Sequence, residues 1–94
     1  METVVKLSKE FVFEDYAPVT ELNLNLSDLK GNDIIEVSDI LQAQGHISVQ
    51  SSLDTKVHAA LAARSIGRPV EYINALPAPD FMKVCQKVQS FLLA

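Results

Sequence analysis

The segment from Val5 to Phe13, VKLSKEFVF, alternates apolar and polar side chains, and ELNLNL at Glu21 to Leu26 does the same. Successive side chains of a strand point to opposite faces, so this alternation is typical of strands with one buried face. The residues between them, Glu14 to Pro18, have the composition of a turn. The sequence therefore predicts an antiparallel β-hairpin over residues 1–26. Lys9 interrupts the apolar face and predicts a bulge or a strand end.

Beyond Leu26 the apolar spacing becomes helical. Asn32 is a candidate N-cap for a first helix that Gly45 ends, with its apolar side at Ile34, Val37, Ile40 and Leu41. The polar residues 46–52 predict a loop. Asp54 is a candidate N-cap for an alanine-rich second helix that Gly67 ends, and Pro69 starts a short third helix.

The last helix, predicted from about Pro79 to Leu93, has the clearest pattern in the chain. Its apolar residues recur at helical spacing and form one stripe: Phe81, Val84, Cys85, Val88, Phe91 and Leu92. Asp80 lies near its start, where the helix dipole favours an anion. These patterns together predict an α+β fold of one domain, residues 1–94, in which a hairpin (1–26) precedes three or four packed helices (27–94).

Length and charge exclude several classes of protein. A chain of 94 residues forms one small domain with a thin core. It lacks an apolar run long enough to span a membrane, and it has no basic stripe with interleaved aromatic residues. We therefore expect a cytoplasmic protein whose partners are neither membranes nor nucleic acid. The single cysteine fits a reducing compartment.

Residue types that can carry chemistry are present, but each has a simpler interpretation. Ser27 and Lys30 fit a Ser-x-x-Lys pattern, yet the large domain and further motifs of those acyl-enzymes are missing. His46 and His58 lack the companions of a zinc site and are interpreted as surface residues. Cys85 lies in the apolar stripe, which indicates packing. We expect no catalytic, cofactor or metal site.

Acidic residues on the first predicted helix have the same kind of interpretation. Asp33, Glu36 and Asp39 are spaced as helical neighbours, and a solvated acidic face explains them without proton transfer.

The chain has more apolar side chains and strand edges than a thin core can bury, which favours a protein-binding function. These features are the hairpin edges and the apolar residues of the last helix. The candidate partner-binding residues are at the chain end, where methionine and leucine can repack around varied partners: Met82, Phe91, Leu92 and Leu93. Open edges and the alanine-rich helix also predict a homo-oligomer.

Three groups of residues, taken together, resemble the small tail assembly chaperones of phages and prophages. They are Lys6–Lys9, the segment from Leu22 to Leu29 that leads into Lys30-Gly31, and Ala75–Phe81, which reads ALPAPDF. The resemblance lies in their order and spacing, and it covers nearly the whole chain. Gly67-Arg68-Pro69 and the terminal Phe91-Leu92-Leu93 match the family's helix break and its helix end. Residues 42–52 depart from the family by being short and polar.

The resemblance implies a non-enzymatic protein of the host cytoplasm. Such a protein keeps the tape-measure protein soluble, helps the tail tube protein polymerise around it, and is left out of the mature virion. The rival hypothesis is a minor structural tail or head-tail joining protein that stays in the particle, and mass spectrometry of purified virions would separate the two.

Overall fold

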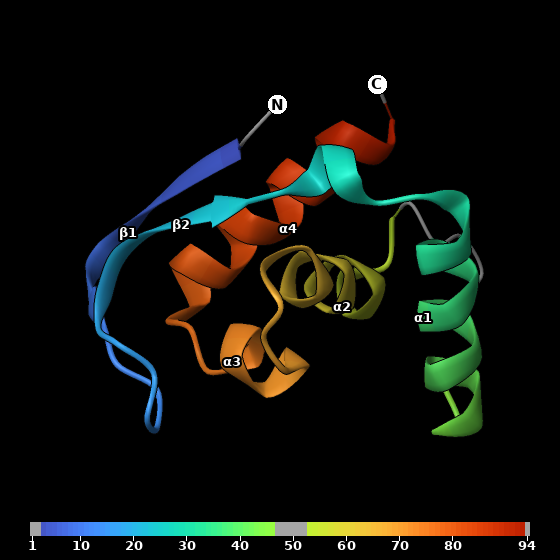
Figure 1. Ribbon diagram of the computed structural model, residues 1–94, viewed down its shortest axis with the longest axis horizontal. Coiled ribbons are helices and arrows are strands. Elements are labelled where there is room, and N and C mark those ends of the chain that lie inside the picture. The colour runs from blue at the N-terminus through green and yellow to red at the C-terminus, as the bar shows by residue number, and fades with distance from the viewer. Residues whose placement is uncertain (1–2, 47–52, 94) are drawn as a thin grey trace.

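Two strands precede the helices along the chain in the computed structural model, which describes residues 3–46 and 53–93 (Figure 1). The elements in chain order are β1 (Thr3–Phe11), β2 (Val19–Leu24), a 3-10 turn η1 (Leu26–Asp28), α1 (Gly31–Ala43), α2 (Thr55–Ile66), α3 (Val70–Asn74) and α4 (Ala78–Leu92). The predicted α+β fold, a hairpin followed by packed helices, is confirmed.

The hairpin is antiparallel and irregular at one point. Val5 pairs with Leu22 and Lys6 with Glu21, but Phe11 pairs with Val19, so β1 has extra residues between Lys6 and Phe11. This irregularity includes Lys9 and confirms the predicted bulge. The apolar side chains that point to the helices are buried, with Leu24 fully covered.

The prediction that both hairpin edges stay open is wrong for β1. The Ser8 backbone N–H donates to Asp80 Oδ1 at 2.9 Å, and Lys83 Nζ donates to the Lys6 carbonyl at 3.3 Å. Asp80 and Lys83 both belong to α4, which therefore covers the polar edge of β1. Lys83 lies on the side of α4 opposite its buried stripe, and Asp80 lies in the first turn of α4.

Local sequence signals place most helix ends. Asp54 caps α2 by accepting a hydrogen bond from the Lys56 N–H, and Gly67 ends α2 in the left-handed conformation with φ of 67°. The predicted cap at Asn32 is wrong, because α1 begins at Gly31 with Lys30 as N-cap. The Lys30 N–H instead donates to the side chain of Asp33. Of the predicted 46–52 loop, only His46 lies inside the described residues.

The core surrounds α2, which contacts α1, α3, α4, β2 and η1 and lies at the centre of Figure 1. It is buried on nearly all sides, through Val57, His58, Ala59, Leu61, Ala62 and Ala63. The interpretation of His58 as a surface residue is therefore wrong, since it is only 1% exposed. Alanine side chains let the neighbouring helices approach α2 closely.

An aromatic cluster joins the hairpin turn to α3. Tyr72 packs edge-on against Phe11, Phe13 and Tyr16, with ring centroids 5.2 to 5.5 Å apart. The Arg68 guanidinium lies 4.3 Å from the centre of the Tyr16 ring. These contacts fix the turn of the hairpin on the helical part. In the described part of the chain, no helix has the length and apolar character needed to cross a membrane.

Candidate partner-binding surfaces

The outermost helix, α1, is joined to the rest of the molecule mainly through α2. Arg64 of α2 donates from Nη1 to Asp33 at 3.0 Å and to Glu36 at 2.5 Å. Val37, one turn further along α1, is buried against the core. The first half of α1 is therefore held by one ion-pair cluster, by the buried Val37 and by Ile34, which packs partly buried against the core. Of the predicted solvated acidic face, Glu36 and Asp39 are exposed, whereas Asp33 is half-buried, and both Asp33 and Glu36 pair with Arg64.

The ion-pair cluster shifts the pKa of its members. The hydrogen bond from the Lys30 N–H, and then that from Arg64, lower the pKa of Asp33 below its ordinary value of 3.8. Hydrogen bonds to Glu36 and Asp33 raise the pKa of Arg64. Both groups are thus held in their charged forms at neutral pH.

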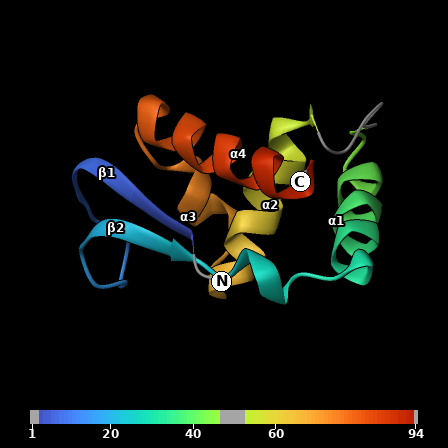
Figure 2. The same ribbon diagram turned by 90° about the horizontal axis from the view of Figure 1, so that it is seen from above.

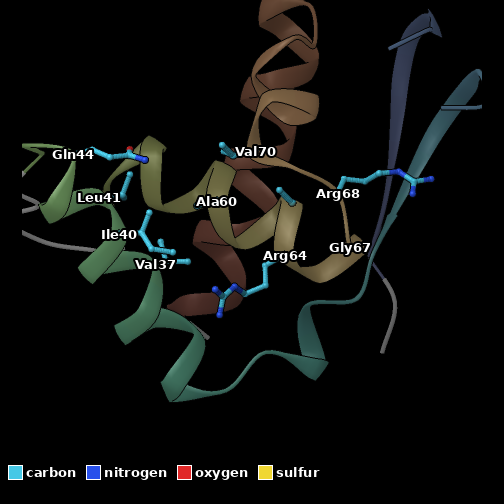
Figure 3. Close-up of a pocket in the computed structure, with 10 residues that line it drawn as sticks. Val37, Ile40, Leu41, Gln44, Ala60, Arg64, Gly67, Arg68 and Val70 are labelled. Carbon is cyan, nitrogen blue, oxygen red and sulfur yellow. The ribbon is translucent and has the colours of Figure 1, made fainter. Parts of the chain in front are cut away.

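A groove of about 370 Å³ lies between α1 and the segment formed by α2 and the start of α3 (Figure 3). α1 forms one wall, while α2 and the start of α3 form the other. The lining residues are Val37, Ile40, Leu41, Gln44, Ala60, Ala63, Arg64, Gly67, Arg68 and Val70. The volume lies at the lower end of the range for ligand pockets, which extends from about 300 Å³.

The groove is apolar at its base and open to solvent. Ile40 is 51% exposed although it lies on the same side of α1 as the buried Val37. Ala60 of α2 and Gly67, which follows α2, carry little or no side chain. The wall of the groove formed by these residues therefore has few protruding side-chain atoms. Arg68 extends from the groove toward the hairpin, where it meets Tyr16 (Figure 3). The groove therefore offers a shallow apolar surface suited to side chains of another helix.

The four residues predicted from the sequence do not form one patch. Met82 is 47% exposed, Phe91 38% and Leu93 57%, whereas Leu92 packs partly buried against the core. Met82 and Leu93 are about three helical turns apart and share a side of α4, but Phe91 is about two and a half turns from Met82 and lies on another side. Met82 and Leu93 thus remain as exposed contacts at the two ends of one face.

Groups that could carry chemistry are held in structural contacts. Burial raises the pKa of the Cys85 thiol to about 11, so the thiolate needed for nucleophilic attack is disfavoured. His46 Nε2 lies 2.7 Å from Asp54 Oδ2 and joins the end of α1 to the start of α2. Within residues 3–46 and 53–93, no three His, Cys, Asp or Glu side chains come together as metal ligands would.

Comparison of the chain with protein-family models, with curated proteins and with solved structures found no match.

Sequence reasoning missed the groove although it named many of its residues. The sequence predicts the apolar side of the first helix at Val37, Ile40 and Leu41, and it predicts the end of the second helix at Gly67. The spacing of apolar residues shows which side of a helix faces inward. It does not show that a groove remains between α1 and α2, because that depends on how the two helices cross.

Proposed function

We propose that this chain is a non-enzymatic tail assembly chaperone that binds the tape-measure protein and assists assembly of the tail tube around it. In this proposal it acts in the host cytoplasm and is not part of the mature virion. The sequence resemblance supplies the biological setting. The observation that carries the binding function is the open apolar groove between α1 and α2.

The groove suits a helical partner for three physical reasons. Its base is apolar, so it rewards the burial of leucine or methionine side chains from another helix. Gln44 lines the groove and has an amide group that can donate a hydrogen bond to the partner's polar groups. Its shallow form accepts varied side chains, which a chaperone of a long helical protein needs because it binds many segments weakly and is later displaced.

The test is co-expression of the chain with the tape-measure protein of its own phage or prophage. The wild-type chain should bring the long partner into the soluble fraction and form a complex with it. Ile40→Asp should weaken binding roughly ten- to hundredfold, because it replaces a groove side chain with a charge. The matched control is Ile35→Asp on the same helix, which is 59% exposed but does not line the groove.

If Ile40→Asp and Ile35→Asp weaken binding equally, the partner does not bind in the groove. Met82→Asp and Leu93→Asp in the same assay measure whether the exposed face of α4 makes a second contact, as the sequence predicts for Met82, Phe91, Leu92 and Leu93. If the wild-type chain leaves the tape-measure protein insoluble and no complex is captured, the chaperone proposal is wrong. That result would favour the rival hypothesis, a structural component that stays in the particle.

A further inference from the structure

The two edges of the hairpin are not equivalent. The outer edge of β1 is occupied by α4, since the Ser8 N–H donates to Asp80 and the Lys6 carbonyl accepts from Lys83. Figure 2 shows α4 on the β1 side of the hairpin, whereas no described helix runs along the outer side of β2. β2 therefore has an edge that no helix or strand of the described residues covers.

The hydrogen bonds of Lys6 and Ser8 identify the groups on that open edge. In an antiparallel pair, residues alternate between those whose backbone faces the partner strand and those whose backbone faces outward. The Lys6 carbonyl faces outward, so its pairing partner Glu21 faces outward on the other side, as does Asn23, which pairs with Val4. Outside the β1–β2 ladder, no hydrogen bond within residues 3–46 and 53–93 is made by the backbone N–H or C=O of Glu21 or Asn23.

The edge also lacks the features that block strand addition. Val19–Leu24 contains no proline, no lysine and no bulge of its own, and its single charge is Glu21. An edge of this kind is a ready template for another strand.

We propose that β2 pairs with β2 of a second copy of this chain, antiparallel and about a two-fold axis at Leu22. The sheets of both copies then join in the order β1-β2-β2-β1. In this register Glu21 of each copy exchanges both backbone hydrogen bonds with Asn23 of the other. The proposal does not depend on the tail-assembly function.

Charge selects this register over its nearest competitor. A two-fold axis at Glu21 gives a similar overlap but places the Glu21 carboxylates of both copies directly opposite, and like charges in that position are destabilising. With the axis at Leu22, four solvent-facing side chains lie side by side across the four strands. Their order is Lys6, Glu21, Asn23 of the second copy and Val4 of the second copy. Each Glu21 then keeps Lys6 on one side and meets a neutral amide on the other.

The buried face fits the same register. Leu22 meets Leu22 of the second copy across the axis in a non-hydrogen-bonded pair, where side chains approach most closely. Leu24, which is fully buried, faces the small Thr20 of the second copy. The strand is thus complementary to itself on both faces, which is the requirement for a symmetric interface and the reason that a second copy is the occupant.

Substitutions at Asn23 test the interface without changing the charges that face each other within one copy, since Asn23 pairs there with Val4. Sedimentation equilibrium of the purified chain should show a monomer–dimer equilibrium. Asn23→Lys places a cation opposite each Glu21 and should tighten the dimer about two- to thirtyfold, while Asn23→Glu should weaken it by a similar factor. Asn74→Lys and Asn74→Glu, at the exposed end of α3, make the same changes in net charge away from the edge.

The expected result is opposite shifts for the two Asn23 variants and no shift for the two Asn74 variants. Circular dichroism of each variant shows whether it is folded. A wild-type chain that stays monomeric at millimolar concentration overturns the proposal, as do Asn74 variants that shift the dimer as far as the Asn23 variants. Amide protection at Glu21 and Asn23 that develops only with a different protein present also overturns it, since the edge would then serve another chain.

Discussion

Asp80 is the residue that ties the two ends of the chain together. It is fully buried, and its carboxylate accepts hydrogen bonds from both the N–H and the hydroxyl of Ser8, 72 residues away. Lys83 Nζ lies 3.7 Å from the same carboxylate and compensates its charge. The buried charge is therefore fully used, and its removal would leave the N–H of Ser8 without an acceptor.

Asp80→Ala should lower the free energy of unfolding by about 1 to 3 kcal/mol, the cost of an unsatisfied buried donor. Ser8→Ala should cost less, about 0.5 to 1.5 kcal/mol, because it removes the hydroxyl but keeps the backbone N–H. Urea denaturation measures both, with Asp28→Ala on the exposed end of η1 as the control. Equal stability of Asp80→Ala and the wild-type chain would show that this contact does not hold α4 on the hairpin.

The sequence predicted part of this role. The place of Asp80 in the first turn of the last helix was evident, and it was explained by the helix dipole. Its partner was not evident, because the contact with Ser8 depends on the docking of α4 on that edge of β1.

At the level of elements, the sequence predicted best what local spacing controls. Five features follow from neighbouring residues: the hairpin, the Lys9 bulge, the Asp54 cap, the end of α2 at Gly67 and the last helix at Ala78–Leu92. It predicted least well what depends on docking: the burial of His58, the covered edge of β1 and the groove beside α1. The apolar stripe of the last helix likewise extends to Phe91, which the structure leaves 38% exposed.

The attachment of α1 predicts a dependence on pH. The pKa of Asp33 is lowered in the folded chain, so its carboxylate stabilises the docked helix above its ordinary pKa of 3.8, and this stabilisation is lost as the pH falls through the lowered value. Between about pH 5 and about pH 3, amide exchange in α1, corrected for intrinsic rates, should therefore increase more than exchange in α4.

Asp33→Asn provides the matched comparison for this measurement. It removes the titrating group but keeps the size of the side chain, so α1 should exchange faster at pH 5 and respond less to acid. Equal responses of α1 and α4 in the wild-type chain would mean that the cluster around Arg64 does not control the docking of α1.

For the whole molecule, the two proposed interfaces lie on opposite sides of α2. The hairpin and α1 stand at the two ends of the view in Figure 1, with α2 between them. A dimer formed through β2 would therefore leave both grooves beside α1 open. A dimer of this kind could hold two segments of one long partner, which raises the strength of binding without any new contact at either groove.

This arrangement requires the hairpin and the helices to behave as one domain, as predicted for residues 1–94. The chain has two tyrosines and no tryptophan, and Tyr16 and Tyr72 both lie in the cluster that joins the hairpin turn to α3. Tyrosine fluorescence thus reports the junction, while far-ultraviolet circular dichroism reports mainly the helices. Because Leu24 and Leu26 of the hairpin segment are buried in the same core as Val84 and Val88 of α4, the two signals should change together in urea.

Tyr72→Ala removes the aromatic ring at the centre of the cluster, so it should lower the free energy of unfolding by about 3 to 5 kcal/mol. Both transitions should therefore occur at a lower urea concentration. A tyrosine transition at clearly lower urea than the helical one in the wild-type chain would show that the hairpin separates first, and β2 would then not be a fixed edge for pairing.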